Sequence, residues 1–160
     1  MINPAGSLVN EQVIAAIVAD LADAFDSGDA RQFGELLRYA RWRLIATGAE
    51  FVGTRGAEAL ASRSVRLYDG LPRTQHDVSN LLIEVAPSGD KATARSEFAV
   101  LQATEDLPLQ FILAGHYEDA FALVEERWRL TSRDEHWDLI GRLDQHLAVV
   151  PGCETVGKGR

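Results

Sequence analysis

The sequence is poor in cysteine and in basic residues, and both shortages restrict what the protein can be. Cys153 is the single cysteine among 160 residues, so a framework of intrachain disulfides is excluded. A lone thiol fits a reducing compartment. Sixteen Lys and Arg residues stand against twenty-four Asp and Glu residues, which gives a formal net charge of −8. Because nucleic acids and anionic membranes attract basic surfaces, neither is expected as a partner.

Signals for export and membrane insertion are missing as well. The first basic residue is Arg31, so no charged segment precedes an apolar stretch. The apolar residues that begin at Val13 are soon followed by Asp20, Asp23 and Asp26, which is too early for a membrane span. A cytoplasmic location is therefore expected.

Several motifs of known chemistry are absent. The sequence contains no glycine-rich phosphate loop, no His-Glu-x-x-His pair, no Cys-x-x-Cys pair and no Gly-x-Ser-x-Gly elbow. Its four histidines are far apart along the chain: His76, His116, His136 and His146. A metal site built from them would depend on the tertiary fold alone, so neither a metal nor a cofactor is expected.

The chain has the length and composition of one globular domain, with 46% hydrophobic and 25% charged residues. Apolar residues recur at spacings of three and four from Val9 to Phe25, which predicts an amphipathic helix that ends at Gly28. Asp29 is predicted to cap a second helix, with Gln32 as its capping-box partner. Thr54 is predicted to cap a third helix, which continues to residue 68.

The remaining periodicity is that of strands. Alternation over residues 42–47 predicts one strand with a short partner at 50–52, and longer strands are predicted at 75–85, 92–103, 109–121 and 127–133. Such long strands are expected to contain bulges, and Gly115 in mid-strand indicates a bulge or a close backbone approach. Helices followed by a strand meander indicate an α+β domain over residues 1–150, with a flexible tail at 151–160.

The stretch around His76 carries the most chemical information. Alternation places His76, Val78 and Asn80 on one face of a strand, which puts polar groups among apolar ones. His76 is then either a core histidine bonded to a nearby carbonyl or a base in an apolar pocket. Asp26 either serves the turn that ends the first helix or faces this histidine. A facing carboxylate would fix one imidazole tautomer and make the pair a general base.

Aromatic residues on the later strands have two interpretations. Tyr117 shares a face with Leu113, Asp119 and Phe121, so it either lines a pocket or covers the core. Trp128 and Trp137 are interpreted as packing residues.

These stretches, in this order, resemble the SnoaL-like branch of the nuclear-transport-factor-two-like superfamily. The resemblance covers residues 12–147 and is carried by five segments: 25–29, 53–57, 76–80, 115–121 and 128–133. It implies a cystatin-like α+β barrel, a cone in which a curved antiparallel sheet wraps three N-terminal helices around a deep apolar pocket. Because many such proteins pair through the outer sheet face, it also implies a homodimer or a larger homo-oligomer.

Within that superfamily the sequence is similar to relatives of scytalone dehydratase and hexachlorocyclohexane dehydrochlorinase, which are built around an Asp-His dyad. The resemblance makes His76 the proton acceptor and Asp26 its orienting partner. It also implies a cofactor-free lyase or isomerase that acts on an apolar, polycyclic or terpenoid small molecule. The pocket residues it suggests are Trp42, Asn80, Tyr39 and Tyr117.

The resemblance leaves one departure and one alternative. The positions where the dehydrochlorinase has basic residues correspond to 19–21 and 120–123, which contain no Lys or Arg, so dehydrochlorination is not expected. The same superfamily contains the non-catalytic small subunits of aromatic-ring hydroxylating dioxygenases, and residues 67–76 resemble proteins near that group. A subunit of that kind, or a ligand-binding module, is the alternative to an enzyme.

Overall fold

The computed structural model describes residues 4–152. Its three helices are α1 (Pro4–Asp26), α2 (Ala30–Leu36) and α3 (Gly53–Arg63). Its six strands are β1 (Arg41–Leu44), β2 (Ala49–Val52), β3 (Thr74–Val85), β4 (Lys91–Thr104), β5 (Leu107–Val124) and β6 (Arg127–Ile140). The predicted α+β class is confirmed. Within the described residues, no helix combines the length and the apolar character that a membrane span requires.

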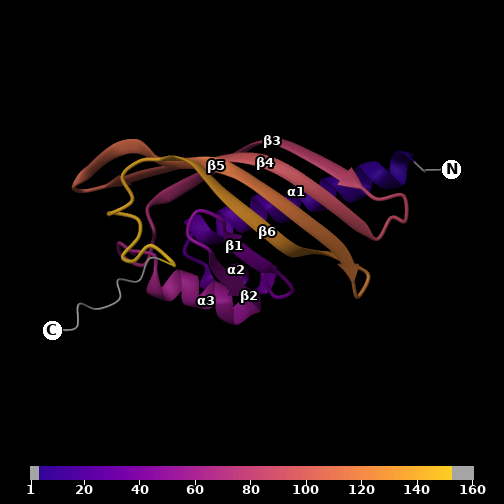
Figure 1. Cartoon of the computed structure of the whole chain (residues 1–160), viewed down its shortest axis with the longest axis horizontal. Helices are drawn as coiled ribbons and strands as arrows, with labels where there is room; N and C mark the ends of the chain where they lie inside the picture. Colours follow the sequence, from indigo (N-terminus) through magenta and orange to yellow (C-terminus); the bar gives the residue numbers. More distant parts are fainter. Residues whose placement is uncertain (1–3, 153–160) are drawn as a thin grey trace.

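The six strands form one curved sheet in the order β2-β1-β6-β5-β4-β3. Its neighbours are antiparallel except for β1 and β6, which pair in parallel. The sheet does not close into a barrel, because β2 and β3 lie at opposite edges. Figure 1 shows the long strands β3 to β6 arching over α1, with α2 and α3 below.

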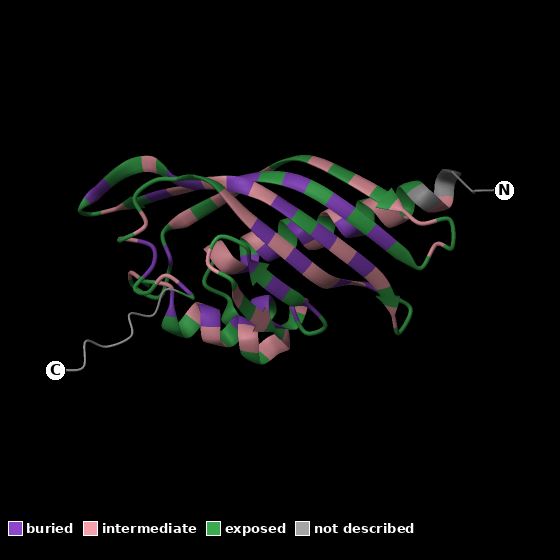
Figure 2. Cartoon of the chain, viewed as in Figure 1, coloured by how far each residue is buried: buried purple, intermediate pink, exposed green. Residues whose placement is uncertain are grey.

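The core lies between α1 and the concave face of the sheet. Burial alternates along the strands, most regularly on β4, so one face is packed and the other is exposed (Figure 2). On the packed face, the ring of Phe98 stacks on the ring of Tyr117, with 4.3 Å between centroids. The α1 side contributes Ile14, Val18 and Leu21, all buried.

The predicted end of the first helix and the predicted cap of the second are confirmed. Gly28 has a φ of +72°, a left-handed conformation that L side chains rarely adopt, and it follows the end of α1. The Asp29 carboxylate then accepts a hydrogen bond from the backbone N–H of Gln32 at 2.9 Å. This N-cap starts α2 at Ala30.

Three predicted boundaries are wrong. Thr54 does not cap α3: Val52 occupies the N-cap position, and the Thr54 hydroxyl instead donates to the carbonyl of Gly34 at 3.1 Å. The helix ends at Arg63 rather than at residue 68, because the chain then pairs as a bridge between Val65 and Leu147. Strand β6 continues to residue 140 rather than ending at 133.

The predicted bulges are present. Register shifts occur between Ser79 and Leu82 on β3 and at two places in the pairing of β5 with β6. One of these lies at Gly115, where an added Cβ would lie 1.8 Å from the carbonyl oxygen of His136. The expected close backbone approach at Gly115 is therefore confirmed.

The first two residues of the predicted tail lie within the described structure. Pro151 is buried, and a Cβ on Gly152 would lie 2.8 Å from the Thr47 carbonyl oxygen. The rest of the predicted tail, residues 153–160, lies outside the described residues.

We expect Gly115→Ala to destabilise the fold by about 3 kcal/mol or more, because the new methyl group overlaps backbone that cannot move without breaking the sheet pairing. Gly48→Ala is the matched control: Gly48 has a φ of +73°, but a Cβ added there would have no neighbouring atom within 4 Å. Its cost should be about 1 kcal/mol, from backbone conformation alone. Urea unfolding of both variants measures the difference, and equal losses would contradict the steric explanation.

Candidate active site

A small cavity lies inside the cone, between α1 and the concave face of the sheet. Its volume is about 60 Å³, room for a few water molecules. Typical ligand pockets measure about 300–1,000 Å³, so the cavity is much smaller than the deep pocket that the resemblance implied. Most of its lining is apolar, and the polar and aromatic side chains that reach it include Trp42, His76, Tyr117, Arg133, Glu135 and His146.

The structure brings Asp26 and His76 into direct contact. One carboxylate oxygen of Asp26 lies 2.7 Å from Nδ1 of His76 and accepts a second hydrogen bond from the Thr74 hydroxyl at 2.8 Å. The other oxygen accepts the backbone N–H of His76 at 2.6 Å. Asp26 thus holds both the backbone and the ring of the histidine. Because a carboxylate accepts hydrogen bonds, Nδ1 carries the proton, and Nε2 of the neutral ring has a free lone pair.

Local structure explains why these two residues meet. Asp26 is the last residue of α1, and His76 lies at the start of β3, the strand that packs against that helix. The imidazole also packs edge-on against Phe25, with ring centroids 5.0 Å apart. The two side chains are 14% and 19% exposed, so the pair is largely shielded from water.

Glu135 on β6 is a buried carboxylate in the same cavity. Its two oxygens accept hydrogen bonds from the indole N–H groups of Trp42 at 2.9 Å and Trp137 at 2.6 Å. Burial raises the pKa of Glu135, and the hydrogen bond from Trp137 and the charges of His76 and Arg133 offset part of that rise. The group therefore holds its proton to a higher pH than an exposed glutamate does.

Arg133 places a cation in the cavity wall, although residues 19–21 and 120–123 contain no Lys or Arg. Its guanidinium forms two hydrogen bonds with the carboxylate of Asp119, at 2.8 and 2.7 Å, and both side chains are buried. Burial lowers the pKa of Arg133, but the Asp119 carboxylate raises it by more, so the group stays charged. The guanidinium carbon also lies 3.9 Å from the ring centre of Tyr117. Because the Asp119 carboxylate neutralises it, this cation already has its counter-ion within the protein.

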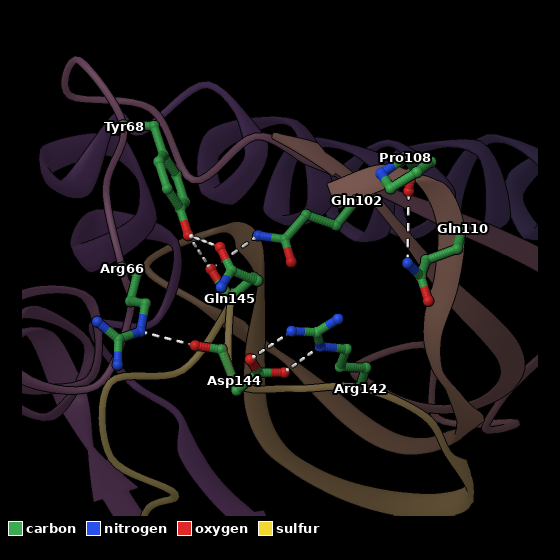
Figure 3. A network of polar contacts seen from close by, with 8 residues as sticks. All are labelled: Arg66, Tyr68, Gln102, Pro108, Gln110, Arg142, Asp144 and Gln145. Atoms are coloured by element: carbon green, nitrogen blue, oxygen red, sulfur yellow. Dashed lines mark hydrogen bonds and ion pairs between the residues drawn. The ribbon is translucent and has the colours of Figure 1, made fainter. Parts of the chain in front are cut away.

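A polar network ties residues 144–145 to Arg66, Tyr68 and Gln102 (Figure 3). The hydroxyl of Tyr68 donates to the backbone carbonyl of Gln145 at 2.6 Å, and the Gln102 amide donates to the same carbonyl at 3.1 Å. The Arg66 guanidinium donates to the backbone carbonyl of Asp144 at 2.8 Å. These bonds hold the segment that carries the next residue, His146, into the cavity wall.

His146 is a buried histidine held in its neutral form. The pKa of His146 is lowered from 6.5 to about 4, first by burial and then by the charge of His76, while Asp26 acts in the opposite direction. Its Nδ1 has no hydrogen-bond partner among the described residues. The ring packs edge-on against Phe25, with centroids 5.9 Å apart.

The structure separates the residues predicted from the sequence into two groups. Trp42 and Tyr117 line the cavity together with His76. Asn80 does not: the bulge after Ser79 and its own φ of 49° turn it outward, where its amide donates to Glu97 at 2.6 Å. Tyr39 is also outside, 37% exposed, next to the guanidinium groups of Arg38 and Arg129.

Sequence reasoning missed Glu135, Trp137 as a lining residue, and His146. The strand predicted from the sequence ends at residue 133, before Glu135 and Trp137. The bulge at Thr131 shifts the phase of that strand, after which Arg133, Glu135 and Trp137 face inward. His146 lies in an irregular segment, where no periodicity could have indicated it.

Comparison with protein families gives a clear assignment. A family model described as a SnoaL-like domain matches residues 7–134. The chain belongs to the SnoaL-like family. No curated protein sequence matches this SnoaL-like protein.

Solved structures support the same fold. The chain is similar to a protein of unknown function from Mycobacterium tuberculosis, at 22% identity and a TM-score of 0.72, over 86% of this chain and 78% of that one. It is similar to an NTF2-like protein with a cystatin-like fold from Novosphingobium aromaticivorans, at 20% identity, a TM-score of 0.69 and coverages of 82% and 83%. It is also similar to hexachlorocyclohexane dehydrochlorinase from Novosphingobium barchaimii LL02, at 18% identity, a TM-score of 0.70 and coverages of 93% and 97%. The predicted cystatin-like fold is confirmed.

The lowered pKa of His146 predicts a pH dependence of stability. Below pH 6.5 the unfolded chain takes up a proton at this histidine, whereas the folded protein does not until about pH 4. The free energy of unfolding should therefore fall by up to about 3 kcal/mol between these two values. Urea unfolding across this range should show a shallower dependence for His146→Gln than for the native protein. An equally steep dependence in both would show that His146 is not the group responsible.

Proposed function

We propose that this SnoaL-like protein is a cofactor-free lyase or isomerase that removes a proton from an apolar small molecule inside the cone. The observation that carries the proposal is the contact between Asp26 and His76. It fixes the orientation and the tautomer of an imidazole that is largely shielded from water. His76 is the general base, and Asp26 is the residue that positions it.

The proton acceptor in this mechanism is Nε2 of His76. The substrate has an acidic C–H bond next to a carbonyl group. Nε2 takes that proton, and the electron pair of the C–H bond forms a carbon–carbon double bond while a leaving group departs from the adjacent carbon. The imidazolium that results is stabilised by Asp26, which accepts its Nδ1–H at 2.7 Å.

Glu135 is the proposed proton donor. Because burial raises its pKa, a larger fraction is protonated at a given pH than for an exposed glutamate. A hydroxyl leaving group protonated by Glu135 departs as water, so the products are the alkene and water. Solvent then returns a proton to Glu135 and removes one from His76. Neutral leaving groups fit this cavity better than anions, because Asp119 already pairs with Arg133.

Substrate size depends on Phe25. A second hollow of about 300 Å³ lies between the helices and residues 65–72, and it shares Phe25, Phe33 and Val65 with the cavity. Movement of the Phe25 ring would join the two spaces and provide the volume that an apolar ring system needs.

We expect Phe25→Leu to strengthen the binding of bulky apolar molecules, because it removes part of the partition between the two spaces. Fluorescence titration with an apolar dye measures this against Leu123→Ala, a control change at an exposed position on β5. Unchanged dye affinity in Phe25→Leu would argue against this route.

The proposed chemistry is tested by proton exchange, which does not require the natural product to be known. Cyclic ketones and β-hydroxy ketones are incubated with the protein in D₂O, and loss of the α-proton signal is followed by NMR. We expect His76→Gln to slow exchange by about 100-fold or more, because the base is lost. Asp26→Asn should slow it by at least about tenfold, because the amide no longer stabilises the imidazolium.

The matched control is His136→Gln, a histidine of β6 outside the cavity lining, which should leave exchange unchanged. Exchange that persists in His76→Gln would refute the role of His76.

The small cavity supports a second candidate, a non-catalytic subunit or ligand-binding module. A volume of about 60 Å³ leaves little space for a substrate without movement of Phe25. Under this alternative, no ketone exchanges in the presence of the protein, while a partner protein or ligand raises its melting temperature.

A further inference from the structure

We propose that the outer face of the sheet carries a binding site for a divalent transition metal, with zinc as the expected ion. The ligands are His116 and Glu118 from β5 and His136 from β6, and Asp138 from β6 supports them. This proposal is independent of the proposed function, because it concerns different residues on the other face of the sheet.

Pairing of β5 with β6 creates the cluster. The register places His116 directly opposite His136, although the two are far apart along the chain. Tyr117 and Glu135, their neighbours along the strands, reach the cavity. Because successive strand residues face opposite sides of a sheet, the two histidines face outward, away from the cavity.

Distances within the cluster suit metal binding. One potential ligand atom from each of His116, Glu118 and His136 lies within 4.8 Å of the other two. Tetrahedral zinc with bonds of about 2.1 Å requires ligand atoms roughly 3.4 Å apart, so a modest contraction brings the three atoms into position. Nε2 of His136 already lies 3.7 Å from a carboxylate oxygen of Glu118.

One atom of the cluster is left without its usual partner. Nε2 of His136 is shielded from water, yet it has no hydrogen-bond partner among the described residues. Buried polar atoms of this kind usually have a protein group, a water molecule or an ion as partner. A metal ion between His136 and Glu118 would satisfy it.

Asp138 gives His116 the arrangement found at many metal sites. A carboxylate oxygen of Asp138 lies 2.6 Å from Nδ1 of His116, so Nδ1 carries the proton and Nε2 is left as the ligand. The two imidazole rings stack in parallel, with centroids 4.3 Å apart and planes 7° from parallel. Binding turns them out of this stack, since lone pairs in parallel planes cannot meet at one ion. Both rings are partly exposed, at 19% and 28%, and rotation about the ring torsion is soft.

The donor set selects the class of metal. Two imidazoles with one carboxylate favour zinc, nickel or copper over magnesium or calcium, which prefer ligand sets made of oxygen. The net charge of −8 adds a general attraction for cations.

The test is a titration of the full-length, tag-free protein with Zn²⁺ by calorimetry, together with the visible spectrum of the Co²⁺ form. We expect one Zn²⁺ per chain and a rise in melting temperature that Mg²⁺ does not produce. His116→Ala and His136→Ala should each weaken Zn²⁺ binding by at least about tenfold, and Glu118→Gln should weaken it too.

Two control variants locate the site. His76→Gln alters the cavity and Cys153→Ser removes the chain's single thiol, and both should bind Zn²⁺ as the native protein does. The melting temperature of each alanine variant without metal shows whether it is folded. No Zn²⁺ binding by the native protein, undiminished binding by the folded His136→Ala, or loss of binding in either control would overturn the proposal.

Discussion

The candidate site depends on a single carboxylate that joins the end of a helix to the start of a strand. Asp26 accepts hydrogen bonds from the Thr74 hydroxyl, the His76 backbone and the His76 ring. Hydrogen bonds to charged groups contribute about 1.5–3 kcal/mol each, so this contact stabilises the packing of α1 on β3 as well as the histidine. Position and chemistry are therefore coupled: the bonds that dock the helix also select the imidazole tautomer.

The second constraint is the set of bulges in the long strands. A bulge adds one residue and reverses which face the following side chains occupy. On β6 the extra residue at Thr131 turns Arg133 and Glu135 inward, and on β3 the irregularity after Ser79 turns Asn80 outward. The chemical character of the cavity thus follows from where alternation is interrupted, as much as from which residues the strands contain.

This explains how much could be predicted from the sequence. Helix α1, the Asp29 cap and the four long strands follow from local periodicity and turn chemistry, and residues before any bulge, such as His76, were assigned to the correct face. Asn80 was misplaced because a bulge leaves no signal in hydrophobic alternation until its position is known. The contact between Asp26 and His76 is tertiary, so the residues alone could suggest it only as one of two interpretations.

Strands β5 and β6 illustrate how one register can serve two surfaces. Gly115 permits the His136 carbonyl to approach closely, and that approach fixes the pairing of the two strands. The same pairing brings Tyr117 and Glu135 together on the concave side and His116 and His136 together on the outer side. A metal ion bound by the outer pair would restrict sliding between the two strands. The two surfaces use different side chains, but both depend on the same pairing of β5 with β6.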